Sequence, residues 1–107
     1  MPAQTITLEV YQGATLAFLM DYIGQDGTPA PDLELATATM RFGQGSPVEG
    51  DIDAENGSIR FEVEPFVTQQ WPAEASGVRF QVWLEYDTET PRTECVLEGN
   101  IEVREAL

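Results

Sequence analysis

The segment from Asp51 to Gly57 is the stretch whose residue types and spacing come closest to a metal site. Acids at positions 51, 53 and 55 match the first, third and fifth ligands of a calcium-binding loop, and Glu62 falls at the twelfth. The glycine stands at loop position seven rather than six, however, and the flanking residues alternate like strands rather than helices. We therefore favour a hairpin turn with solvated acids, and predict neither a metal site nor a cofactor.

Enzymatic chemistry lacks most of its usual residues in this chain. There is no histidine, and Cys95 is the single cysteine, so no Ser–His or Cys–His pair can form. No glycine-rich phosphate loop opens a helix. With 19 acids in 107 residues, some carboxylates must fall close together by chance, so a carboxylate pair alone does not indicate a glycosidase. We predict that the protein is not an enzyme and has no catalytic residues.

Trp83 and Arg79 are the side chains best suited to contact another protein. Both fall on the polar phase of a predicted strand, and tryptophan and arginine are enriched at the energetic centres of protein interfaces. The alternative is that Trp83 is covered from within the chain, by the crossover at 65–75 or by an edge loop. We predict a partner interface at Trp83 and Arg79 and keep the covered tryptophan as the alternative.

The element that must position these residues is a long hairpin spanning 77–103. Apolar and polar side chains alternate along its first half, the period-two pattern of a half-buried strand. After a polar turn at 88–91 the alternation resumes, which places Cys95 and Leu97 on the apolar face and Glu94 on the acidic one. Cys95 is accordingly predicted to be a buried structural thiol. Because an isolated hairpin is marginal in water, the apolar face needs a second sheet.

The rest of the chain supplies the strands and one helix. Alternation predicts strands over 5–11, 15–22, 35–42 and 59–64, with a short edge strand at 48–52. A short helix is predicted at 65–71, with one proline in its first turn and another directly after it.

This pattern predicts an all-β protein, an antiparallel two-sheet immunoglobulin-like β-sandwich of six to eight strands with one short helical crossover. Residues 1–107 form one domain in this prediction, and a small closed barrel is the structural alternative. The predicted core residues are the inward apolar positions Leu8, Val10, Phe18, Met20, Met40, Phe42, Ile59, Phe61, Phe80, Val82, Leu84, Leu97 and Ile101.

Charge narrows the classes of partner. The 19 acids are opposed by only five basic residues, all of them arginines, and the net charge is −14. Binding to nucleic acid or to an anionic membrane is therefore disfavoured, since both need clustered basic residues. A basic partner, a cation or a self-repelling solvated surface fits better. The N-terminal residues show no signal peptide, so we expect a chain made and folded in a reducing cytoplasm.

Several short motifs follow one another along the chain in an order that is also found in a known group of proteins. They are Ile6-Thr7-Leu8, Tyr11-Gln12-Gly13-Ala14-Thr15-Leu16, Asp26-Gly27-Thr28-Pro29, Ala38-Thr39-Met40-Arg41-Phe42, Asn56-Gly57-Ser58-Ile59, the turn at 65–71, Val82-Trp83-Leu84-Glu85-Tyr86-Asp87 and the end of the chain from Val96 to Val103. In this order the chain resembles small phage and prophage structural proteins with the fold of the N-terminal domain of phage upper baseplate proteins. The resemblance implies a non-enzymatic virion component of the tail, neck, baseplate or capsid surface.

The resemblance also implies the partners and the location. The protein is expected to bind other virion proteins and copies of itself, as a homo-oligomer within an assembly. It is expected in the virion, after folding in the host bacterial cytoplasm. The family's pattern offers no catalytic residues to carry over, and the strong acidity and the absence of lysine depart from it.

Two other functions stay open at this point. A small acidic phage-encoded inhibitor could mimic nucleic acid, because acids two residues apart on a strand, such as Glu62 and Glu64, lie about 6.5–7 Å apart, near the phosphate spacing. Arginines on the same outward phases, such as Arg60 and Arg79, would interrupt such a row. A calcium-binding module is the third hypothesis and depends on the segment at 51–62 alone.

Overall fold

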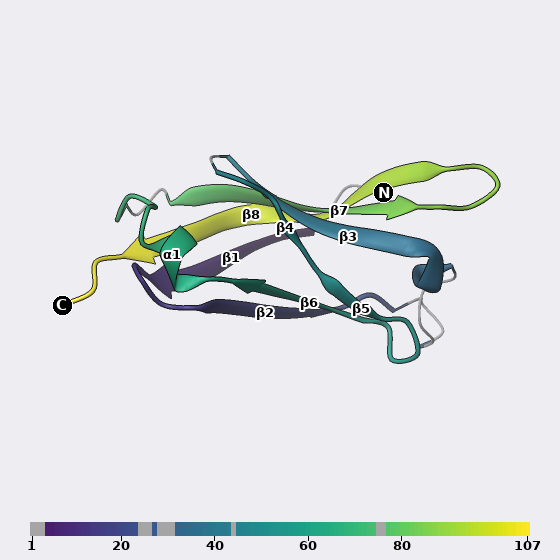
Figure 1. The fold of residues 1–107 in the computed structure, drawn as a ribbon, viewed down its shortest axis with the longest axis horizontal. Helices are drawn as coiled ribbons and strands as arrows, with labels where there is room; N and C mark the ends of the chain where they lie inside the picture. Colours follow the sequence, from purple (N-terminus) through teal and green to yellow (C-terminus); the bar gives the residue numbers. More distant parts are fainter. Residues whose placement is uncertain (1–3, 24–26, 28–31, 44, 75–76) are drawn as a thin grey trace.

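The computed structural model describes residues 4–23, 27, 32–43, 45–74 and 77–107, and shows two sheets packed face to face (Figure 1). The five-stranded sheet has the order β1 (Gln4–Tyr11), β8 (Arg92–Arg104), β7 (Val78–Tyr86), β3 (Ala36–Phe42) and β4 (Val48–Glu49). The three-stranded sheet has the order β2 (Leu16–Asp21), β6 (Ser58–Val63) and β5 (Asp51–Asp53). The molecule is elongated along the strands, measuring 47 × 24 × 23 Å.

The predicted immunoglobulin-like sandwich is confirmed. The order β8-β7-β3-β4 corresponds to the G-F-C-C′ sheet of a variable-type immunoglobulin domain, and β2-β6-β5 corresponds to strands B, E and D of the facing sheet. One strand pair differs from the predicted antiparallel arrangement: β1 runs parallel to β8 along its whole length. The chain then crosses to the other sheet through the turn at 12–15, so β1 and β2 belong to different sheets.

The core lies between the sheets and contains most of the predicted residues. Leu8, Phe18, Met20 and Phe42 are only partly buried and pack against it. The prediction missed Leu33, which a short 3₁₀ helix, η1 (Leu33–Leu35), places in the core, because no strand periodicity marks it. The predicted residues that are buried are Val10, Met40, Ile59, Phe61, Phe80, Val82, Leu84, Leu97 and Ile101.

The single edge strand predicted at 48–52 is wrong, because Gly50 divides it between the two sheets. Val48 pairs with Met40 of β3, whereas Asp51 pairs with Arg60 of β6. A Cβ atom at Gly50 would lie 2.6 Å from a ring carbon of Phe61. Glycine is therefore needed where the chain passes over this core side chain.

A β-bulge in the long hairpin reverses the side-chain phase of one strand. Val82 lies opposite Leu97, but its neighbour Trp83 lies opposite Cys95, so Val96 is the extra residue of β8. The predicted positions of Cys95 and Glu94 are consequently wrong. Cys95 is half-buried on the outer face, and Glu94 lies on the inner phase. A period-two pattern carries no signal for an inserted residue, so the sequence could not show this reversal.

The predicted crossover helix is present and closes one end of the core. The helix α1 (Pro65–Thr68) begins at Pro65, and the chain continues as turns to Trp71. The buried hydroxyl of Thr68 donates a hydrogen bond to the carbonyl oxygen of Ala14 at 2.7 Å. The ring centroid of Trp71 lies 5.1 Å from that of Phe42, so this tryptophan belongs to the core. The motif at 26–29, Gly27 apart, lies outside the described residues.

We expect Phe80→Ala to lower the free energy of unfolding by about 3–5 kcal/mol, because Phe80 is only 2% exposed in a packed core. Phe66→Ala is the matched control, since the same truncation at a side chain that is 73% exposed should change stability little. Thermal and urea unfolding of both variants give the measurement. Equal midpoints for Phe80→Ala and the unmodified protein would contradict the assigned phase of β7.

Candidate protein interface on the five-stranded sheet

The outer face of the five-stranded sheet carries the predicted interface tryptophan near its middle. Strand register places Thr39 and Cys95 on either side of Trp83. These neighbours are short and uncharged, so a large aromatic side chain stands among small ones. We call the outward side chains of this region the Trp83 face; its members are Thr39, Arg41, Gln81, Trp83, Glu85 and Cys95.

Two polar contacts fix the orientation of the indole, and an ion pair holds one of its partners. The guanidinium carbon of Arg41 lies 4.9 Å from the ring centroid of Trp83, a cation–π arrangement. The indole Nε1–H donates to Oε1 of Gln81 at 3.1 Å. Arg41 is held in turn by Glu85, with Nη2 and Oε1 3.6 Å apart. An exposed cation–π contact is worth about 0.5–1 kcal/mol, enough to favour one orientation of the ring.

The structure places Arg79 on the same face but not against the tryptophan. Arg79 is four residues before Trp83 on β7, about 13 Å away along an antiparallel strand. Arg41 on the neighbouring strand makes the contact instead. Sequence analysis missed Arg41 because finding it requires the register between β3 and β7. Within the described residues, Arg79 is exposed and has no ion pair, whereas the other arginines have at least one each.

The crossover that could have covered Trp83 packs elsewhere. Its tryptophan, Trp71, packs against Phe42 with the two rings tilted by 55°, and the backbone carbonyl of Trp71 accepts a hydrogen bond from Nε2 of Gln12 at 2.7 Å. Among the described residues, Trp83 contacts Arg41 and Gln81 of its own sheet. Trp83 is thus half-buried by neighbours on the sheet rather than by the crossover.

Cys95 contributes a neutral thiol to the Trp83 face. Partial burial raises the pKa of Cys95, and the negative charge of Glu98 raises it further. Its Sγ lies 3.7 Å from the carbonyl oxygen of Leu97. Because the thiolate is the reactive form, this cysteine is a poor nucleophile at neutral pH.

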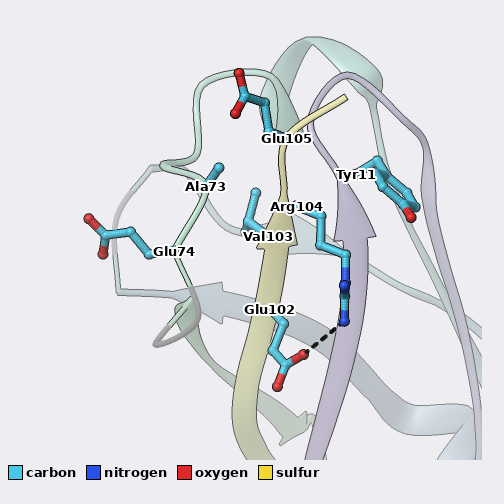
Figure 2. A pocket seen from close by; sticks show the side chains of 7 residues that line it. All are labelled: Tyr11, Ala73, Glu74, Glu102, Val103, Arg104 and Glu105. Atoms are coloured by element: carbon cyan, nitrogen blue, oxygen red, sulfur yellow. Dashed lines mark ion pairs between the residues drawn. The ribbon is translucent and has the colours of Figure 1, made fainter. Parts of the chain in front are cut away.

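A shallow hollow of about 430 Å³ lies at the end of the five-stranded sheet where β1 and β8 end (Figure 2). Its walls are Tyr11, Ala73, Glu74, Glu102, Val103, Arg104 and Glu105. Arg104 forms ion pairs with Glu9 and with Glu102, the latter at 3.9 Å. Figure 2 shows the carboxylate of Glu74 pointing away from that second pair. The carboxylates of the hollow therefore do not converge on one point, as ligands of a common metal ion would.

A tyrosine-rich cluster joins the two sheets at the far end. The hydroxyl of Tyr22 donates to Oε2 of Glu94 at 3.4 Å, linking the end of β2 to β8. The guanidinium of Arg92 lies 4.2 Å from the ring centroid of Tyr86, and its Nε lies 3.0 Å from Oε1 of Glu94. Burial raises the pKa of Tyr22 to about 12, with smaller contributions from Tyr86 and Glu94. This hydroxyl is accordingly a donor at neutral pH and not a base.

The segment at 51–57 forms β5 and the turn that leads from it to β6. Asp53 accepts hydrogen bonds from the backbone N–H of Asn56 at 3.3 Å and from its Nδ2 at 2.7 Å. Gly57 adopts a φ of 71°, as expected for the glycine of an Asn-Gly turn. Across the described part of the chain, no three His, Cys, Asp or Glu side chains are grouped to hold a metal ion.

The fold and the Trp83 face define a small immunoglobulin-like β-sandwich domain with an aromatic patch on one sheet. Residues 2–104 match the model of the LtfC-like β-sandwich domain family, and the chain belongs to this family. No curated protein matches the sequence. In the described residues, no helix has the length and apolar character needed to span a membrane.

We expect millimolar calcium and EDTA to leave the thermal midpoint unchanged, because Asp53 already caps its own turn. A real site would stabilise the fold by mass action. Magnesium and sodium chloride at matched ionic strength are the controls for charge screening. A calcium-specific rise that Asp53→Ala abolishes would show that the segment binds the ion.

We expect Tyr22→Phe to remove a late step from the alkaline titration. A folded-state pKa near 12, against about 10 for an unperturbed tyrosine, means that the neutral tyrosine stabilises the fold fully below pH 10. That contribution is lost as the pH rises from 10 to 12. Ultraviolet absorbance of tyrosinate measures the titration, and Tyr11→Phe, at a 53% exposed side chain, is the control. An unchanged late step in Tyr22→Phe would refute the assignment.

Proposed function

We propose that this protein is a non-enzymatic structural component of a phage particle, acting through protein–protein assembly in the tail, neck, baseplate or capsid surface. The ordered motifs that resemble phage structural proteins support this role, and family membership supplies a fold compatible with it. The observation that carries the proposal is Trp83, an oriented tryptophan at the centre of an outer sheet face.

The Trp83 face has the composition of an interface centre. Stable interfaces combine an apolar or aromatic centre with a polar rim and bury about 800 Å² on each partner. Here the ring of Trp83 is the centre, flanked by Thr39 and Cys95, and the rim carries Glu85 and Glu98. Arg79, exposed on the same face without an ion pair in the described part, offers a guanidinium to an acidic group of the partner.

Mimicry of nucleic acid is less well supported than assembly. The row of outward acids on and after β6, which includes Glu62, is interrupted by Arg60. The Nη2 of Arg60 lies 3.3 Å from Oε2 of Glu62. Another outward acid, Glu9 on β1, is paired with Arg104. A mimic needs a continuous row of unneutralised charges, so these ion pairs weaken the electrostatic match.

The first test is mass spectrometry of purified particles, in which we expect the protein as a constituent. Trp83→Ala should weaken its binding to the neighbouring virion protein by about tenfold or more, since truncated hot-spot residues typically cost upwards of 1–2 kcal/mol. Phe66→Ala is the control, because it removes an exposed aromatic side chain outside the Trp83 face.

Two outcomes would contradict the structural role. One is a protein that is abundant in infected cells and absent from particles. The other is binding to a basic partner that falls steeply with salt, is lost in Glu62→Lys or Glu98→Lys, and ignores Trp83→Ala. Either result would favour the acidic inhibitor instead.

A further inference from the structure

The three-stranded sheet ends at β2, and within the described residues no strand pairs with the outer edge of β2. In the immunoglobulin plan that position belongs to strand A, which pairs with strand B in the same sheet. Here the first strand, β1, pairs with β8 in the other sheet instead. Among the strands that the structure describes, none therefore occupies the position beside β2.

The register shows which backbone groups of β2 face this outer edge. The N–H of Tyr22 donates to the carbonyl oxygen of Gly57 at 2.6 Å, so Tyr22 faces β6. In an antiparallel pair, alternate residues direct both their N–H and their C=O toward the partner. Phe18 and Met20 are in phase with Tyr22 and face β6. Ala17 and Leu19 therefore direct their backbone groups to the open edge.

The side chains at the middle of this edge, Ala17 and Leu19, are apolar and exposed. Leu19 is 64% exposed, and Ala17 is exposed beside it. The side chain across from Leu19 is Arg60, which is engaged with Glu62. An exposed leucine next to free backbone groups is what a further strand would cover.

The edge of β2 lacks the features that usually prevent strand addition, which are prolines, lysines, bulges and very short strands. The six residues of β2 contain neither proline nor lysine, and their pairing with β6 is regular. The other sheet edges differ. β4 has two residues, and β5 has three, with an aspartate at each end. β1 is long, but carries Glu9 within the strand, whereas the single acid of β2, Asp21, is its last residue.

We propose that β2 pairs in antiparallel fashion with β2 of a second copy of this chain, about a two-fold axis at Phe18. In this register Ala17 lies opposite Leu19 of the second copy, and Leu19 opposite Ala17. Asp21 lies opposite Thr15, so the acids of the two strands stand at opposite ends. No like charges face each other, and both exposed leucines become covered.

Size and charge set the expected strength. A stable interface buries about 800 Å² on each partner, and pairing along six residues buries less than this. We therefore expect the isolated chain to form a weak dimer. Each copy carries a net charge of −14, so the dimer must strengthen as salt screens the repulsion. A particle that holds many copies close together would reinforce the same contact through effective concentration.

A pair of proline variants tests the edge directly. Ala17→Pro removes an N–H that points away from β6, so it prevents strand addition at the outer edge of β2, a position where proline is tolerated. Thr7→Pro is the matched control on β1. The N–H of Gln12 donates to the carbonyl oxygen of Arg104 at 2.8 Å, so residues in phase with Gln12 face β8, and Thr7 faces the open side.

Sedimentation equilibrium at low and high salt gives the dissociation constant. We expect Ala17→Pro to raise it at least tenfold and Thr7→Pro to leave it within about twofold, with both thermal midpoints near that of the unmodified protein. A chain that stays monomeric at every salt concentration overturns the proposal. So does dissociation by Thr7→Pro alone, which would place the contact on β1.

A distance measurement tests the register. With Asp21→Cys in a Cys95→Ser background, spin labels on the two copies should lie about 20 Å apart, because each is three residues from the axis. A separation far from this value would overturn the two-fold at Phe18. The dimer is independent of the proposed virion role: Trp83→Ala should not weaken it, and its failure would leave the Trp83 face untouched.

Discussion

The one-residue bulge at Val96 determines how the long hairpin uses its two faces. Beyond the bulge, Leu97 and Ile101 of β8 point into the core and cover the inner side of β7. Before it, the same strand turns Cys95 outward, next to Trp83, and places Glu94 on the inner phase. A regular strand would bring the thiol inside and the carboxylate outside. The bulge thus places Cys95 beside Trp83 on the outer face, and it also places Glu94 in the polar cluster with Tyr22 and Arg92.

The polar cluster connects the two sheets at the end of the sandwich, beyond the apolar core. Tyr22 comes from the three-stranded sheet, and Glu94 and Arg92 come from the five-stranded sheet, so their contacts bridge the layers. A partly buried polar group costs free energy unless it is paired, and here the hydroxyl of Tyr22 has Glu94 as its partner. The opposite end of the core is closed by the crossover, through the ring of Trp71 and the buried hydroxyl of Thr68.

Period-two alternation was sufficient to predict the sandwich and most of its core. It identified β7 and β6 because every second side chain, such as Phe80 and Phe61, is apolar and buried. It could not reveal features that depend on another strand. The switch of sheets at Gly50 depends on the ring of Phe61, and the contact of Arg41 with Trp83 depends on the register between β3 and β7. Cys95 was misplaced for the same reason.

The strong negative charge limits how such a domain can associate. Two copies that each carry −14 repel, so a contact between them must be short-range and free of opposed acids. The edge of β2 meets this condition, because backbone groups and Leu19 occupy its centre and Asp21 stands at one end. The Trp83 face lies on the other sheet, where Arg41 and the nearby Arg79 are exposed, so it suits a different partner. A chain with both surfaces could bind a copy of itself along one sheet while its opposite face contacts another protein, as a component of a repeating assembly must.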